Sequence, residues 1–355
     1  MKNSNATCPA PISSIEAHPL SIGITLQHLF LYIGAACTAL TLLGTLWLVF
    51  RHLRRYTKPD EQRQIIRLVL TPLVYSIFSL ITLADYGSAD YLEPLPDLYE
   101  AFGLACLFVL FVHYMQPPVS VLSENKELMR SWVMVFQYPL IKLILTIAQL
   151  ASTATGRYCE ASANIHFGHI WIVIIGSASL TFCFVSILRF YKEYKLSMAA
   201  HKPMLKLVSF KLIVFIEFVR SLVFNFLDIP SGLSDNGTLS PRDIKYGIPS
   251  VIVVVEMLLF TIFFHYSFRC QMYKSTDPAM ALGAAVVDAA NPTDFLKHVA
   301  RMFSILAGRG RALGSEESRP LQAVSSSDSA SPYPSMGASP MPTAYRSDGG
   351  RLSRY

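Results

Sequence analysis

Residues 247–266 read GIPSVIVVVEMLLFTIFFHY, and this stretch decides the fold class. It is apolar all round over about 20 residues and lacks the alternation of polar and apolar positions that would indicate a barrel strand. An α-helix of about 20 residues is long enough to cross the roughly 30 Å of hydrocarbon in a bilayer. The stretch therefore predicts a transmembrane helix.

Six further stretches of this kind precede it. They cover 26–50, 64–84, 99–117, 133–155, 169–190 and 207–227, and with 248–268 they predict an all-α polytopic membrane protein of seven transmembrane helices. The composition agrees, because 52% of the residues are apolar and only 15% are charged, against about a quarter charged in soluble domains. The net charge of +6 does not indicate a nucleic-acid partner, since the basic residues flank apolar runs.

The basic residues also predict the orientation of the chain. The stretches after the first, third and fifth spans hold eleven Lys and Arg: Arg51, Arg54, Arg55, Lys58, Arg63, Lys126, Arg130, Lys192, Lys195, Lys202 and Lys206. The other side holds only Lys2, Arg157, Arg242 and Lys245. Because Lys and Arg in short loops stay in the cytoplasm, we expect the N-terminus outside and the C-terminus in the cytoplasm.

Residues on the predicted outer side are candidates for covalent modification. The sequons Asn5-Ala6-Thr7 and Asn236-Gly237-Thr238 both fall there, so Asn5 and Asn236 are candidate N-glycosylation sites. Cys8 and Cys159 lie on the same oxidising side and are candidates for a disulfide. The six cysteines lack metal-ligand spacing, so neither a metal nor another cofactor is expected.

The pattern divides the chain into four parts. An outer tail, 1–25, precedes the seven-helix domain, 26–268, which is followed by a cytoplasmic segment, 269–312, and a Ser/Pro-rich tail, 313–355, that we expect to be disordered. After Asn291 and Pro292, apolar residues recur at helical spacing with basic residues around them. This predicts a short amphipathic helix lying on the inner leaflet.

Ionisable residues inside the spans are the candidates for a substrate pathway. Each costs about 2.5 to 3.5 kcal/mol at the middle of a transmembrane helix, so it tends to face the bundle interior. Lys142 lies about ten residues into the fourth span, too deep for its side chain to reach either face easily. The candidates are Lys142, Glu217, Arg220, Glu256 and Glu100.

Two interpretations of these charges remain open. In one, they line a polar cavity whose cations attract an anionic group. In the other, Glu217 neutralises Arg220 and Glu256 neutralises Lys142, and the pairs only fix helix register. Nearer the cytoplasmic end, side chains are expected to extend to the headgroups as anchors; these are Arg67, Lys206 and Lys211.

Other classes of seven-helix protein fit the residues less well. The seventh span lacks the lysine that a retinal protein needs, and the third and seventh spans lack the Glu/Asp-Arg-Tyr and Asn-Pro-x-x-Tyr motifs of rhodopsin-like receptors. A zinc hydrolase needs three converging ligands. Here His166 and His169 lie at the opposite membrane face from His113 and His265, so we do not expect an enzyme.

The stretch from Tyr56 to Arg67, YTKPDEQRQIIR, resembles the signature of the eukaryotic organic solute transporter alpha-subunit family. Stretches at 97–102, 137–142, 156–160, 202–206 and 256–257 are similar in the same order, so the resemblance covers about 26–300. The cysteine-rich run that animal members carry after the third span is absent from 123–131, which favours a fungal or other non-animal member.

The resemblance implies a carrier that moves amphipathic organic anions, such as steroid conjugates, by facilitated diffusion. It also implies a single-span beta-type subunit in animal transporters, and a homo-oligomer is the alternative assembly. A second hypothesis stays open, a signalling or trafficking scaffold that acts through the basic cytoplasmic loops and tail. The plasma membrane and the endomembranes both fit the sequence.

Overall fold

The computed structural model describes residues 23–115, 125–159, 164–226, 240–273 and 279–308, and it leaves out the side chains of 214, 217–218 and 220–226. In these ranges the regular elements are helices. The α-helices are α1 (Leu26–Leu53), α2 (Pro59–Val69), α3 (Thr71–Ala84), α4 (Ala89–Leu92), α5 (Pro94–Met115), α7 (Lys126–Ala154), α8 (Gly168–Tyr194), α9 (Pro203–Phe226), α10 (Ile248–Ser267), α11 (Leu282–Ala290) and α12 (Thr293–Leu306).

Short helical segments join some of these elements. They are the 3-10 helices η1 (Tyr86–Ser88), η2 (Ala199–His201) and η5 (Cys270–Tyr273), and the π-helical η4 (Asp243–Gly247). Pro72 stands in the first turn of α3, next to the break that separates α3 from α2. The second predicted span is therefore two consecutive helices, because proline lacks the N–H group that would continue α2.

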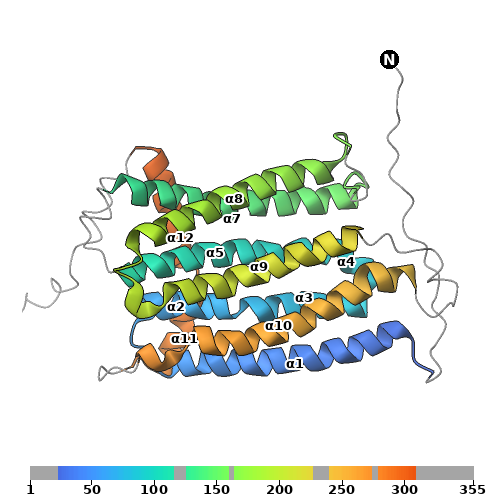
Figure 1. Cartoon of the computed structure of the whole chain (residues 1–355), viewed down its shortest axis with the longest axis horizontal. Coiled ribbons are helices and arrows are strands. Elements are labelled where there is room, and N and C mark those ends of the chain that lie inside the picture. The colour runs from blue at the N-terminus through green and yellow to red at the C-terminus, as the bar shows by residue number, and fades with distance from the viewer. Residues whose placement is uncertain (1–22, 116–124, 160–163, 227–239, 274–278, 309–355) are drawn as a thin grey trace, which may run out of the picture.

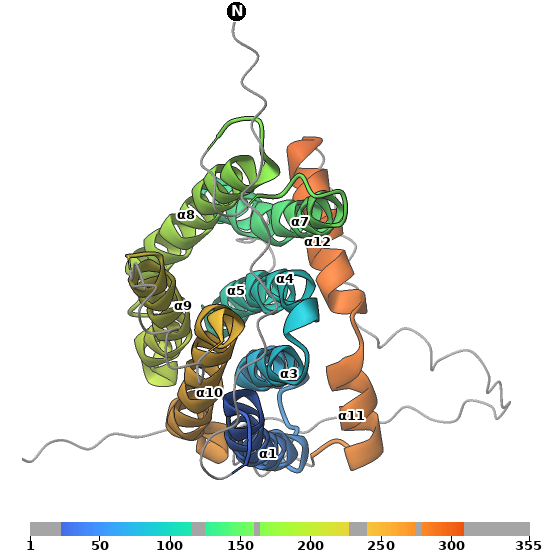
Figure 2. The same cartoon turned by 90° about the vertical axis from the view of Figure 1, so that its right-hand side faces the viewer.

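The long helices form a bundle in which successive helices run in opposite directions (Figure 1). Viewed from one end, α5 lies at the centre, with α7, α8, α9, α10 and α3 around it and α1 on the far side of α3 (Figure 2). Most of α5 is buried, including Leu107, Phe108 and Phe111, which are fully covered. The hydrophobic core thus runs along α5, which contacts α2, α3, α7 and α8.

Among the residues that the structure describes, six segments are long and apolar enough to cross a membrane. They are Leu26–Leu53, Pro59–Ala84, Tyr86–Met115, Lys126–Ala154, Gly168–Tyr194 and Asp243–Tyr273. The predicted sixth span corresponds to α9, which has 24 residues but carries four charged ones, Lys206, Lys211, Glu217 and Arg220. The structure therefore supports an all-helical membrane protein with six such segments, one fewer than the sequence predicts.

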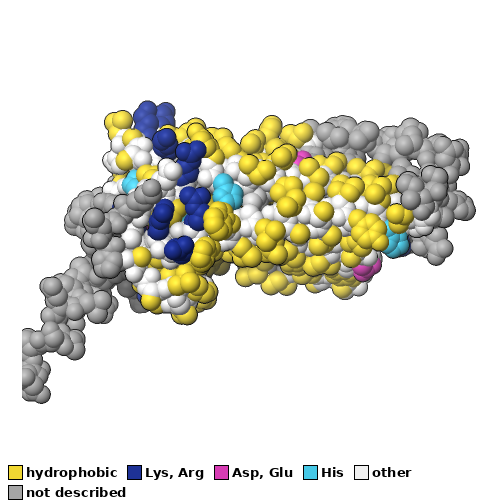
Figure 3. Space-filling model, turned by 90° about the horizontal axis from the view of Figure 1, so that it is seen from below, with side chains coloured by type: hydrophobic (Ala, Val, Ile, Leu, Met, Phe, Trp, Pro, Cys, Tyr) yellow, Lys and Arg dark blue, Asp and Glu magenta, His cyan; other side chains and the backbone are white. Residues whose placement is uncertain are grey.

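The face of the bundle seen in Figure 3 is apolar along most of its length. On α1 and α8 less than a third of the most apolar stretch is buried. Large apolar side chains such as Leu43, Trp47, Trp171 and Phe182 are more than half exposed. A surface of this kind requires an apolar surrounding, which the hydrocarbon of a bilayer supplies.

Basic side chains gather at one end of the bundle, which we call the basic end (Figure 3). Here α1, α5 and α8 end and α2, α7 and α9 begin (Figure 1). The opposite end holds Asp85, Asp90, Glu93 and Asp243. The charge asymmetry expected from the sequence is thus a property of the folded bundle.

Gly103 allows α9 to approach α5 closely, which makes a stability test. A Cβ atom at this position would lie 2.7 Å from Cζ of Phe210, whose ring is fully buried. We expect Gly103→Ala to lower the free energy of unfolding by about 1 to 3 kcal/mol through overpacking. Thermal unfolding of the detergent-purified protein measures this. Gly283→Ala on α11, where no atom lies within 4 Å, is the control and should leave stability unchanged or slightly higher.

Candidate functional site

Lys142 lies near the middle of α7 and forms an ion pair with Asp97 in the first turn of α5. Its Nζ atom is 3.0 Å from Oδ2 of Asp97, and the two side chains are 17% and 50% exposed. The structure thus pairs Lys142 with Asp97, a partner that the sequence analysis did not name. The pairing of Lys142 with Glu256 stays a prediction.

A second carboxylate lies beside this pair. The hydroxyl of Tyr75 on α3 donates a hydrogen bond of 2.8 Å to Oε2 of Glu100, and its oxygen is also 3.4 Å from Oδ1 of Asp97. Glu100 is buried, with 6% of its surface exposed. We call Lys142, Asp97, Glu100 and Tyr75 the Lys142 cluster. It brings together two of the predicted pathway residues, Lys142 and Glu100.

The other predicted residues are placed only in part. Glu256 is half-buried on α10, whereas Glu217 and Arg220 lie on α9 with side chains outside the described set. Their role in a pathway stays a prediction.

The predicted modification sites are placed in part as well. Asn5, Cys8 and Asn236 lie outside the described residues. Cys159 is buried and disulfide-bonded. Glycosylation and the pairing of Cys8 with Cys159 remain predictions.

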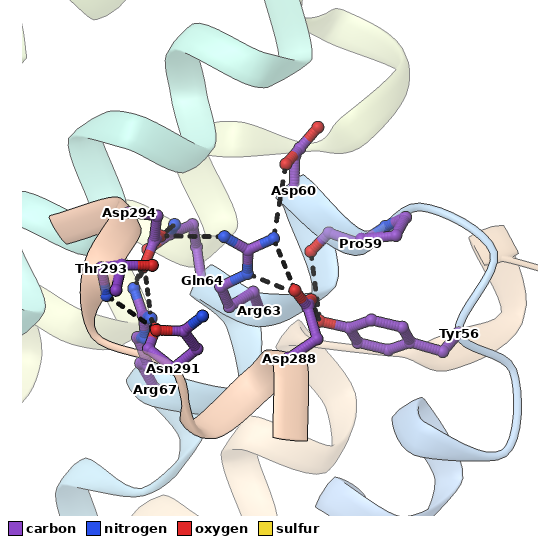
Figure 4. A network of polar contacts seen from close by, with 10 residues as sticks. All are labelled: Tyr56, Pro59, Asp60, Arg63, Gln64, Arg67, Asp288, Asn291, Thr293 and Asp294. Carbon is purple, nitrogen blue, oxygen red and sulfur yellow. Dashed lines mark hydrogen bonds and ion pairs between the residues drawn. The ribbon is translucent and has the colours of Figure 1, made fainter. Parts of the chain in front are cut away.

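A second polar network lies at the basic end, between α2 and the C-terminal helices (Figure 4). Arg67 on α2 donates through two nitrogens to Asp294 on α12, Nη1 to Oδ2 at 2.9 Å and Nη2 to Oδ1 at 2.7 Å. Gln64 Nε2 donates to the same Oδ2 at 2.9 Å. Arg67 Nη2 also donates to the carbonyl oxygen of Asn291 at 2.6 Å.

Arg63 joins the two carboxylates of this network. Its Nη2 atom is 3.1 Å from Oδ1 of Asp288 on α11, and its Nη1 atom is 3.4 Å from Oδ2 of Asp294. The hydroxyl of Tyr56 donates to Oδ2 of Asp288 at 2.7 Å. We call Tyr56, Arg63, Gln64, Arg67, Asp288, Asn291 and Asp294 the clasp.

The clasp corrects the interpretation of Arg67 as an anchor. Its side chain is 8% exposed, and its partners lie more than 220 residues away in the sequence. Lys206 is likewise buried rather than extended, and its Nζ donates to the carbonyl oxygen of His201 at 2.8 Å. Lys211 Nζ lies 4.3 Å from the ring centroid of Phe184. Hydropathy is a local property and carries no signal for such partners.

Aromatic residues connect the clasp to the middle of the bundle. Phe295 on α12 contacts Phe102 on α5 and Phe136 on α7, with ring centroids 4.7 and 5.7 Å apart. Arg67 Cζ lies 5.8 Å from the centroid of Phe102. Five residues, about 8 Å of helix, separate Phe102 from Asp97 along α5. The aromatic residues that Phe295 contacts therefore lie on the same two helices as Asp97 and Lys142, α5 and α7.

The position of α12 explains the titration of two of its residues. Burial raises the pKa of Asp294, but the hydrogen bond and charge of Arg67 outweigh it and hold this pKa at about 2. Burial lowers the pKa of His298 to about 4, with Asp294 opposing this change and His113, Arg301 and Arg67 adding to it. His298 also accepts a 3.0 Å hydrogen bond at its carbonyl oxygen from Nε1 of Trp132.

These pKa values predict acid sensitivity of the folded protein. Because the pKa of His298 is lowered in the folded protein, the folded state binds fewer protons than the unfolded state. The contribution of His298 to stability is therefore lost as the pH falls from about 6.5 to 4. The contribution of Asp294 to stability is lost below about pH 3.8. We expect the unfolding temperature to fall between pH 7 and 4.5, and to fall less in His298→Gln. Exposed His166→Gln is the control. Equal falls in all three proteins would contradict the prediction.

A model of the family described as organic solute transporter Ostalpha matches residues 30–273. The chain belongs to this family. It is also 26% identical over 239 residues to a transmembrane protein 184 homolog of Dictyostelium discoideum, over 61% of this chain and 47% of that protein. The chain thus spans about half the length of this curated relative. No solved structure matches the chain.

Membership of the Ostalpha family, together with the apolar helices, makes the chain an integral, multi-pass membrane protein of a solute-transporter family. The signature Tyr56–Arg67 lies within the family match, and the structure shows what part of it contacts: Tyr56, Arg63, Gln64 and Arg67 all contribute to the clasp. The helices that complete the clasp, α11 and α12, lie beyond the match.

Proposed function

We propose that this protein is a carrier that moves amphipathic organic anions across the membrane by facilitated diffusion through its helix bundle. The family supports transport of a solute. The proposed substrates are steroid- or lipid-like solutes with one anionic group. Such a solute needs a cation to bind its charge and apolar side chains to contact its body.

The observation that carries this proposal is the ion pair between Lys142 and Asp97. A lysine at mid-helix is costly in hydrocarbon and needs a compensating anion. Asp97 supplies that anion from a half-exposed position, whereas the side chain of Lys142 is only 17% exposed. A solute can therefore reach the carboxylate of Asp97, and we propose that an anionic substrate replaces it as the partner of Lys142.

We further propose that α9 is a seventh crossing, with the N-terminus outside. α9 runs alongside the other long helices over its whole length (Figure 1). With seven crossings the basic end faces the cytoplasm, in agreement with the retention of Lys and Arg in cytoplasmic loops. Glycosidase-sensitive mass shifts that disappear in Asn5→Gln/Asn236→Gln are the expected result, whereas protease protection of the tail after α12 in sealed vesicles would contradict this orientation.

Reconstitution into liposomes tests the proposed transport directly. The purified chain should give protein-dependent flux of labelled steroid sulfates or bile-acid-like anions, and not of an uncharged steroid of similar size. Flux should be saturable and independent of an ion gradient, as facilitated diffusion requires. Light scattering of the same preparation shows whether the active species is a monomer or a homo-oligomer.

One result would argue against the proposal, and another would change the assembly that it requires. Absence of flux for every anion, together with recovery of a partner on the basic loops, would favour the signalling or trafficking scaffold. Flux that appears only when a single-span protein is co-reconstituted would instead support transport with a beta-type subunit.

A further inference from the structure

The donors of the clasp converge on one carboxylate from one side. Arg63, Gln64 and Arg67 all lie on α2 and all contact Asp294, at 2.7 to 3.4 Å. Two guanidinium groups and an amide around one oxyanion are the chemistry that binds carboxylate, sulfate or phosphate. In this structure the oxyanion belongs to the chain itself, so Asp294 fills an anion-binding site.

The residues that fill this site come from a segment of its own. α11 and α12 lie end to end along one side of the bundle, roughly across the long helices (Figures 1 and 2). We call them the C-terminal helix pair. The inner face of this pair contacts α2 and α7, while its outer face exposes Val287, Leu296 and Phe303, each by more than half.

The surroundings of the site select an amphipathic ligand. Phe102, Phe136 and Phe295 form an aromatic bed directly beside Arg67. If the C-terminal helix pair moves away, Phe295 leaves and exposes Phe102 and Phe136 next to the two arginines. A small inorganic anion would gain nothing from these rings, whereas an anion with an apolar body would bury that body against them.

We propose that Arg63, Gln64 and Arg67 form a second anion-binding site, at the basic end, which Asp288 and Asp294 occupy until an amphipathic organic anion replaces them. This inference deepens the proposed function and rests on it. The ligand carries a carboxylate, sulfate or phosphate on an apolar body. It reaches the site when the C-terminal helix pair separates from α2 and α7.

Direct binding of a labelled steroid sulfate to the full chain in phosphatidylcholine nanodiscs is the first test. In Asp288→Asn/Asp294→Asn the competing carboxylates are gone and both arginines remain. We expect this variant to bind the probe about tenfold more tightly than the unmodified protein, which corresponds to about 1.4 kcal/mol. Adding Arg67→Gln to the same variant should abolish the gain. Equal affinity of all three proteins for the probe would overturn the proposal. The clasp would then be a structural contact that does not open for a ligand.

A second measurement does not depend on removing any charge. Ala285 on α11 is fully buried near Tyr56 and Ile66. In Ala285→Cys, peptide-resolved thiol labelling reports separation of the helix pair from α2. Steroid sulfate should speed labelling severalfold, and an uncharged steroid should not. An unchanged labelling rate at a sulfate concentration that saturates binding would contradict the exchange.

The lipid composition of the nanodiscs shows whether the anion that binds at the clasp is a lipid headgroup or a free solute. If nanodiscs with an anionic phospholipid speed labelling of Ala285→Cys without added sulfate, a lipid headgroup is the ligand; if only the sulfate does so, the ligand is a free solute. Flux measured in parallel separates the two proposals. Flux of the steroid sulfate without any change in the labelling of Ala285→Cys would contradict only the second site. Binding of the sulfate at the clasp without flux would contradict only the transport proposal.

Discussion

Lys142→Gln is expected to lower the uptake of a steroid sulfate into liposomes about 30-fold, the equivalent of losing about 2 kcal/mol from a hydrogen bond to a charged group. Lys142→Arg should retain part of the activity, since the positive charge persists on the larger guanidinium group. Uptake at constant protein density in the liposomes is the measurement. Lys126→Gln, an exposed lysine at the start of the same helix, is the matched control and should transport normally.

The fold of Lys142→Gln should survive, because the partner that it abandons is half-exposed. Asp97 keeps the neighbouring hydroxyl of Tyr75, and the pair contributes little to stability. We expect an unfolding temperature close to that of the unmodified protein, with Lys142→Gln/Asp97→Asn behaving additively. Full uptake by a well-folded Lys142→Gln protein would end the proposal that Lys142 binds the substrate.

Arg67→Ala should produce the largest loss of stability. It removes the two-pronged contact to Asp294 and leaves that carboxylate partly buried, with 14% of its side chain exposed. Breaking one side of a buried pair costs about 3 to 5 kcal/mol. Chemical unfolding in detergent measures the loss. Arg55→Ala, an exposed arginine just before α2, should change stability by less than about 0.5 kcal/mol.

Neutralising the abandoned carboxylate is the internal check on this second prediction. If the loss comes from an unpaired charge, Arg67→Ala/Asp294→Asn should recover about half of it or more, because the two residues are strongly coupled. A double variant that is no more stable than Arg67→Ala would mean that the arginine acts through its contact with Phe102 instead.

The sequence was sufficient to predict most of the long helices. The stretches 26–50, 133–155, 169–190 and 248–268 correspond to α1, α7, α8 and α10, because an apolar run of that length has no other stable form in a bilayer. The second stretch, 64–84, was predicted as one helix, whereas the structure has α2 ending at Val69 and α3 beginning at Thr71. The ion-pair partners of Lys142 and Arg67 could not be predicted, because they lie far away in the sequence. Asp97 lies 45 residues from Lys142, and Asp294 lies 227 residues from Arg67.

The C-terminal helices also show that the sequence pattern predicts a helix better than it predicts the contacts of that helix. The apolar spacing predicted α12 and its amphipathic character, but not that Phe295, Val299 and Met302 would pack on the bundle while Leu296 and Phe303 stay exposed. α11 was not predicted, because LGAAVVDAA has neither the length nor the charged face of a surface helix. Periodicity identifies an amphipathic face but does not say which surface covers it.

The separation of the two halves of the clasp along the chain also sets an order in time. Arg67 is synthesised 227 residues before Asp294, and at about 5 to 20 residues per second the interval is about 10 to 45 seconds. During that interval Arg63 and Arg67 have been synthesised and Asp288 and Asp294 have not. The clasp can therefore form only after the rest of the helix bundle has been synthesised.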